Sequence, residues 1–117
     1  MATSRWYIKR GDTLPTLTAT LSGPPDSVTG VAPPLNLTSV TSGKLIMHRA
    51  GVTLERALVL LAPLTDGMVE YSFLDADWDD IVAGVYKVEF ELTYNDNKIR
   101  TVPTDDYCQI VVTEDLD

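Results

Sequence analysis

The longest alternation of apolar and polar residues in the chain extends from Val85 to Tyr94. Tyr86, Val88, Phe90, Leu92 and Tyr94 fall on one side, and Lys87, Glu89, Glu91 and Thr93 on the other. Such alternation is typical of a β-strand with one buried face, because successive side chains point to opposite faces of a sheet. The turn-forming residues 95–97 follow, and they predict a hairpin whose second strand covers residues 98–102.

Shorter segments of the same kind predict further strands on both sides of this hairpin. They cover residues 15–21, 35–38, 44–49, 68–73 and 107–113, whereas residues 52–61 are rich in leucine and β-branched residues and remain ambiguous. No segment has the period of a helix longer than one turn. The pattern therefore predicts an all-β fold, an antiparallel β-sandwich of about seven to nine strands with no long helix.

One tyrosine makes this fold class more specific. Tyr86 begins the longest predicted strand and follows an acidic loop and Gly84. This is the position of the tyrosine corner in immunoglobulin-like domains, where the hydroxyl group bonds back to nearby backbone. We therefore expect an immunoglobulin-like sandwich with Tyr86 as its corner, although the usual disulfide of such domains is absent.

Length and charge exclude several classes of protein. The chain has 117 residues, which suits one domain over residues 1–117, and its net charge is −8. That charge argues against nucleic acid and against an anionic membrane as partners. One cysteine excludes an internal disulfide, and the first residues lack the apolar core of a signal peptide. We expect a protein that folds in a reducing compartment such as a cytoplasm.

Few residues offer catalytic or metal-binding chemistry. His48 and Cys108 lie in separate predicted strands, and each is more typical of a structural residue than of a catalyst. The acidic run 75–80 spaces its first carboxylates as a calcium loop does, but it lacks the glycine and the glutamate that such a loop needs. A solvated acidic loop is the preferred interpretation, and the alternative is that Asp79 or Asp80 caps a helical turn over residues 79–82. We expect no enzyme, no catalytic residue, no cofactor and no metal site, and calcium binding by the acidic run is left open.

Two segments are candidate contacts for a partner protein. The N-terminal segment 1–14 contains Trp6, Tyr7 and Ile8, which cannot all face one core, so at least one aromatic side chain should be available to a neighbour. The loop 22–34 contains the prolines Pro24, Pro25, Pro33 and Pro34, which reduce the entropy lost on docking. A third candidate is Trp78 within the acidic run, which would serve a sugar- or receptor-binding surface if its ring were exposed.

Several phrases of the sequence resemble one family in order along the chain. They are Trp6-Tyr7-Ile8-Lys9-Arg10-Gly11-Asp12-Thr13-Leu14-Pro15, Lys44-Leu45-Ile46-Met47-His48-Arg49, Asp66-Gly67-Met68-Val69-Glu70-Tyr71, Ala83-Gly84-Val85-Tyr86, Phe90-Glu91-Leu92-Thr93-Tyr94, Thr101-Val102-Pro103, Asp106-Tyr107 and Glu114-Asp115-Leu116. Together they resemble small bacteriophage virion proteins of the baseplate-upper-protein type. The chain departs from that pattern in its longer proline-rich segment 22–34, at Val102, and at Asp105-Asp106.

The resemblance implies an immunoglobulin-like structural protein of a tailed bacteriophage particle, with no catalytic residue. It implies a place at the tail or baseplate, where the protein bridges or decorates other virion proteins in a symmetric ring or another multi-copy assembly. The neck, the connector and the capsid surface are alternative places, and a surface module that binds a glycan or receptor is the alternative of another class. The resemblance also implies assembly in the cytoplasm of the bacterial host.

Overall fold

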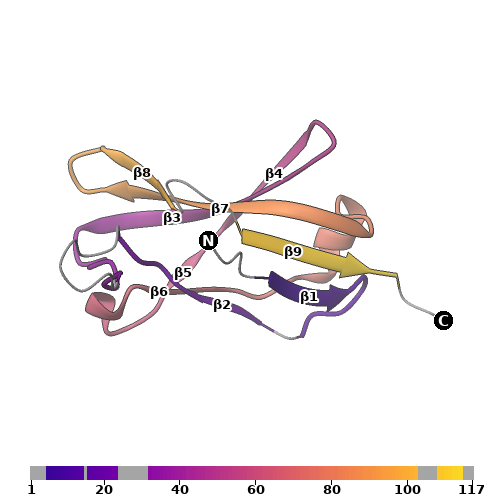
Figure 1. Cartoon of the computed structure of the whole chain (residues 1–117), viewed down its shortest axis with the longest axis horizontal. Helices are drawn as coiled ribbons and strands as arrows, with labels where there is room; N and C mark the ends of the chain where they lie inside the picture. The colour runs from indigo at the N-terminus through magenta and orange to yellow at the C-terminus, as the bar shows by residue number, and fades with distance from the viewer. Residues whose placement is uncertain (1–4, 15, 24–31, 103–107, 115–117) are drawn as a thin grey trace.

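The chain folds into two β-sheets that lie face to face (Figure 1). The computed structural model describes residues 5–14, 16–23, 32–102 and 108–114. Within them are nine strands: β1 (Arg5–Lys9), β2 (Leu17–Thr20), β3 (Val40–Arg49), β4 (Val52–Ala57), β5 (Val59–Leu60), β6 (Met68–Tyr71), β7 (Gly84–Tyr94), β8 (Ile99–Val102) and β9 (Cys108–Thr113). Two 3₁₀ helices, η1 (Leu64–Asp66) and η2 (Asp75–Asp79), lie between strands, so the expectation of an all-β sandwich without a long helix is confirmed.

The strands divide between the two sheets of a β-sandwich. The larger sheet has the order β1-β9-β7-β3-β4, with β8 paired to β7, and the smaller sheet has the order β2-β6-β5. The third, seventh and ninth strands therefore share one sheet, while the second, fifth and sixth share the other. The hairpins β3–β4 and β7–β8 extend away from the body of the larger sheet (Figure 1).

Three parts of the strand prediction are corrected by this topology. The segment before residue 10 contains a strand, β1, which pairs with β9 in parallel, so the sheet is not purely antiparallel. Residues 35–38 form no strand, although Leu37 is fully buried and its N–H donates to the Leu64 carbonyl at 2.8 Å. The ambiguous segment 52–61 divides into β4 and β5, because the chain crosses from the larger to the smaller sheet at the buried Leu58.

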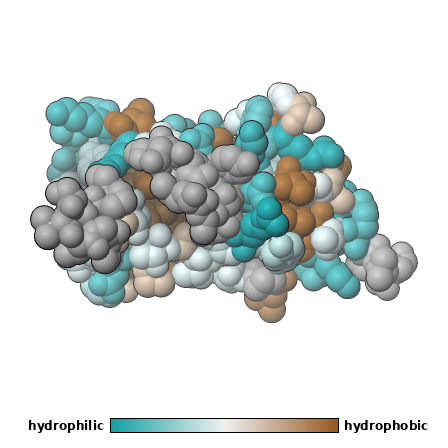
Figure 2. Space-filling view, viewed as in Figure 1, coloured by the Kyte–Doolittle hydropathy of each residue, from teal (hydrophilic) through white to brown (hydrophobic). Residues whose placement is uncertain are grey.

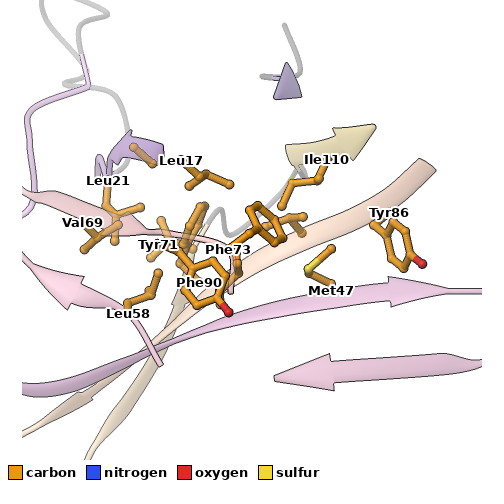
Figure 3. Close-up of a cluster of buried hydrophobic side chains, with 14 of the residues drawn as sticks. Leu17, Leu21, Met47, Leu58, Val69, Tyr71, Phe73, Tyr86, Phe90 and Ile110 are labelled. Atoms are coloured by element: carbon orange, nitrogen blue, oxygen red, sulfur yellow. The ribbon is translucent and has the colours of Figure 1, made fainter. Parts of the chain in front are cut away.

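The hydrophobic core fills the space between the two sheets. Figure 3 shows labelled core side chains from both sheets, including Leu17, Val69 and Tyr71 of the smaller sheet and Met47, Phe90 and Ile110 of the larger. The apolar positions of the predicted strand 85–94 all point into this space, where Val88, Phe90 and Leu92 are at most 1% exposed. None of the helices in the described part of the chain has the length and apolar character needed to cross a bilayer.

Candidate functional site

Strand β1 presents the two aromatic residues of the opening segment in opposite directions. Trp6 and Ile8 point inward: Ile8 is 5% exposed, and the Trp6 ring packs edge-on against Phe90 with ring centroids 6.2 Å apart. Tyr7 points outward and is 59% exposed. Ile8 is therefore a core residue, and its proposed role as a partner contact is wrong, because the strand period places it opposite Tyr7. Tyr7 is the aromatic side chain available to a neighbour.

The neighbours of Tyr7 form a small exposed surface on the outer face of the larger sheet. Across the strands, Tyr7 is in register with Val111 of β9, and Val111 is in register with Val85 of β7. Val85 is 50% exposed, and Arg5 and Lys9 lie two residues to either side of Tyr7 with exposed side chains. We call Arg5, Tyr7, Lys9, Val85 and Val111 the Tyr7 surface. Figure 2 shows hydrophobic residues in separate areas with hydrophilic residues between them, so no single apolar face dominates the visible side.

Side-chain hydrogen bonds hold the end of β1 against the corner that precedes β7. The Arg10 guanidinium donates to the Trp78 carbonyl at 2.7 Å and to the Ile81 carbonyl at 3.2 Å. In return, the Trp78 indole Nε1 donates to the Asp12 carbonyl at 3.1 Å. The main chain continues the link, since the Arg10 N–H donates to the Thr113 carbonyl at 2.8 Å. Tyr7 is therefore carried on a strand anchored beyond its C-terminal end.

Trp78 is part of the core, which corrects its proposed role as an exposed binding platform. Its side chain is 6% exposed, and its ring stacks on Phe73 with centroids 5.3 Å apart and an interplanar angle of 17°. The 3₁₀ helix η2 turns the ring inward while its acidic neighbours Asp75 and Asp79 stay exposed. The apolar indole ring is thus buried against Phe73, although the residues beside it in sequence are acidic.

The acidic run contains one buried carboxylate, Asp77. Arg56 Nε donates to Asp77 Oδ1 at 2.7 Å, and the Leu74 N–H donates to Oδ2 at 2.9 Å. The Tyr71 hydroxyl also donates to Oδ2. Burial by itself raises the pKa of Asp77, but these three donors together outweigh burial and hold its pKa below the ordinary value. Burial and the bond to Asp77 raise the pKa of Tyr71.

These contacts give the acidic run a structural role. Asp77 is already satisfied by Arg56, Tyr71 and Leu74, and Arg56 also reaches Asp80 at 3.2 Å. The described residues contain no group of three or more His, Cys, Asp or Glu side chains placed to hold a metal ion. The turn considered over residues 79–82 is also wrong: the helical turn is η2, which begins four residues earlier at Asp75, where Asp77 Oδ2 accepts a hydrogen bond from the Leu74 N–H.

Tyr86 makes the backbone contact that defines a tyrosine corner. Its hydroxyl donates to the Val82 carbonyl at 2.8 Å and accepts from the Val82 N–H at 3.1 Å. The ring is 2% exposed and lies at the start of β7, as the sequence predicts. Tyr86 therefore serves the corner and is remote from solvent.

The proline-rich segment is described only in part. Pro33 and Pro34 are exposed, and Pro34 forms a single antiparallel bridge with Ser22. Pro24 and Pro25 lie outside the described residues. The segment stays a candidate contact on the strength of its two described prolines.

His48 and Cys108 lie on opposite sides of the larger sheet. His48 faces outward from β3, where its Nδ1 lies 3.0 Å from Thr53 Oγ1, whereas Cys108 packs against the core opposite Val88. The sheet thus separates these two residues, and they form no catalytic pair.

The feature that the sequence analysis missed is the strand β1, which the alternation of Trp6 and Ile8 with Tyr7 and Lys9 would have indicated. In sequence, the chain matches no protein-family model and no curated protein.

Proposed function

We propose that the chain is a non-enzymatic structural protein of a tailed bacteriophage particle, placed at the tail or baseplate. There it bridges or decorates other virion proteins in a symmetric ring or another multi-copy assembly. The proposal begins from the ordered sequence phrases that resemble baseplate-upper-type virion proteins. The fold agrees with this role, since a particle component needs a rigid sandwich with surfaces for neighbours.

One observation carries the proposal: the opening phrase of that resemblance forms an anchored strand that presents Tyr7 to solvent. Tyrosine is among the residues that most often anchor protein interfaces, and an exposed tyrosine flanked by polar residues suits the centre of a contact. Arg10 and Trp78 hold the strand in place, so little ordering is required when a neighbour docks. The Tyr7 surface is therefore the proposed contact with another virion protein.

Two alternatives differ in their support. A place at the neck, the connector or the capsid surface uses the same contact and differs only in the neighbour. A glycan- or receptor-binding module has less support, because the ring expected to form its platform, Trp78, stacks on Phe73 inside the core. The proposal includes assembly in the host cytoplasm, with neither nucleic acid nor membrane as a partner.

Immunogold electron microscopy of purified particles tests the proposal. An antibody to this protein should label the tail tip, and particles from a phage that lacks the gene should carry no label. Label at the neck or over the capsid would keep the structural role and move its place. Absence of label, with the protein recovered only from infected-cell lysate, would overturn the proposal.

A further inference from the structure

The open edge of β1 is the part of the molecule best placed to accept another chain. Among the strands that the structure describes, β1 is the last of the larger sheet on its side, and β9 is its partner. Its register with β9 continues without a bulge from Arg5 to Lys9, and the strand contains no proline. Bulges and prolines are common devices that prevent strand addition, so this edge lacks two of them.

The hydrogen-bond pattern decides which backbone groups face the open side. The Arg10 N–H donates to the Thr113 carbonyl. Because backbone groups alternate in direction along a strand, the backbone groups of Ile8 and Trp6 also point toward β9. The N–H and carbonyl of Tyr7 therefore point away from β9. The Asp12 N–H donates to the Lys9 carbonyl at 3.0 Å, which agrees with a Lys9 backbone that also points away from β9. Tyr7 thus offers its backbone at the edge and its ring on the outer face to the same incoming chain.

Charge restricts the kind of chain that fits. Arg5 and Lys9 share the outer face with Tyr7, and neither forms an ion pair within the part of the chain that the structure describes. A second copy of β1 added to this edge would place Arg5 opposite Lys9 or opposite itself, and directly opposed like charges destabilise a strand pair.

We infer that the β1 edge binds an extended segment of a different protein by strand addition, and that this segment carries acidic residues two positions to either side of an apolar residue. The acidic residues pair with Arg5 and Lys9, the apolar residue packs beside Tyr7, and the backbone bonds to Tyr7. The spacing is symmetric, so it fits a parallel or an antiparallel segment. The inference rests on the proposed function for its setting, since it specifies the chemistry of the virion neighbour.

Peptide binding to the full chain tests this inference without any particle. The probe is the blocked peptide Ser-Glu-Thr-Val-Thr-Glu-Ser, and a peptide with lysine in place of both glutamates is its control. With ¹⁵N-labelled protein, the acidic peptide should shift the amide signals of Arg5–Lys9, and the lysine peptide should not. Reversal of both charges, in Arg5→Glu/Lys9→Glu, should weaken binding about tenfold. Lys98→Glu, which reverses one charge on the exposed β7–β8 hairpin, should leave binding unchanged.

A second pair of variants separates strand addition from side-chain docking. Tyr7→Pro removes the outward N–H and leaves the bonds to β9 in place, whereas Tyr7→Val removes the phenol ring and keeps that N–H. Strand addition predicts that Tyr7→Pro weakens peptide binding about tenfold relative to Tyr7→Val. Equal binding by the two variants would overturn it. If Tyr7→Pro does not fold, the charge-reversal variants decide the inference.

The remaining outcomes are also decisive. No shift at β1 with millimolar acidic peptide, or equal shifts with the lysine peptide, would overturn the inference. Shifts at β1 that depend on protein concentration alone would identify a second copy as the occupant and overturn it as well. Label on particles without peptide binding would contradict the inference and keep the proposed function, and peptide binding without label would do the reverse.

Discussion

Arg56 and Asp77 form an ion pair, with 2.7 Å between Nε and Oδ1, that connects the edge strand of the larger sheet to the corner before β7. The Asp77 side chain is 6% exposed and that of Arg56 is 21% exposed. Tyr71, from the smaller sheet, donates to the same carboxylate. One carboxylate thus joins elements of both sheets, and the acidic run contributes to the fold through it.

Replacement of Asp77 should destabilise the protein strongly. Asp77→Ala leaves Arg56, the Tyr71 hydroxyl and the Leu74 N–H without their acceptor, and we expect a loss of about 3 kcal/mol in the free energy of unfolding. Asp79→Ala changes an exposed carboxylate of the same 3₁₀ helix and should stay within about 0.5 kcal/mol of wild type. Urea denaturation measures both. Equal midpoints for the two variants would contradict the role given to Asp77.

Acid should weaken the protein through the same carboxylate. The folded state lowers the pKa of Asp77, so its contribution to stability is complete above the pKa of the unfolded chain, about 3.9. The contribution is lost as the pH falls below that value, because the unfolded chain then takes up a proton that the folded state binds poorly. The free energy of unfolding should therefore fall less steeply below about pH 4 in Asp77→Asn than in wild type. Urea denaturation at a series of pH values measures this. Equal slopes of the free energy of unfolding against pH in wild type and Asp77→Asn would contradict the prediction.

Alkali should act through Tyr71. The folded state raises the pKa of this phenol, so its contribution is complete below the ordinary pKa of about 10 and is lost as the pH rises beyond it. Tyr71→Phe should accordingly show a shallower loss of stability above about pH 10 than wild type. Tyr7→Phe removes the same atom from an exposed ring and should keep the wild-type slope. Denaturation between pH 9 and pH 11 distinguishes the variants, and a wild-type slope for Tyr71→Phe would refute the assignment.

The corner hydroxyl should contribute a modest and measurable stabilisation. Tyr86→Phe removes the bonds to the Val82 carbonyl and N–H, at an expected cost of about 1 kcal/mol. Tyr94 lies at the other end of β7, and the described residues offer its hydroxyl no hydrogen bond, so Tyr94→Phe is the matched control. Thermal unfolding should show a lower Tm for Tyr86→Phe alone. An unchanged melting curve for that variant would argue against the corner.

Calcium should have no effect on the acidic run. The central carboxylate, Asp77, is engaged by Arg56, Tyr71 and Leu74, so a cation would have to displace three donors to reach it. We expect millimolar calcium to leave both the Tm and the fluorescence of Trp78 unchanged, with magnesium as the control. Trp6→Phe isolates the Trp78 signal. A saturable change in fluorescence with calcium alone would show that the run binds the ion.

Strands with strict alternation were predictable because their burial follows from a local rule. The prediction of residues 85–94 differs from β7 by one residue, and Tyr86 lies at the predicted corner. β1 was not predicted as a strand, although its residues alternate, because Trp6 and Tyr7 are both aromatic and hide the alternation. Its pairing was also hidden, since β9 lies about a hundred residues away and a parallel pairing leaves no turn in the sequence. The Tyr7 surface shows the same limit: the exposure of one aromatic residue was predicted, but its neighbours Val85 and Val111 follow only from the strand order.

By itself, the sequence determined the all-β class, the inward face of the long strand and the tyrosine corner, because each depends on residues close together in the chain. Tertiary structure decided which residues of the irregular segments are buried. Trp78 and Asp77 belong to a polar run with no period, and they are buried because Phe73, Arg10 and Arg56 supply a ring, a guanidinium and a counter-charge. Of these partners, Arg10 and Arg56 are distant in sequence, and no local pattern specifies that they meet the acidic run.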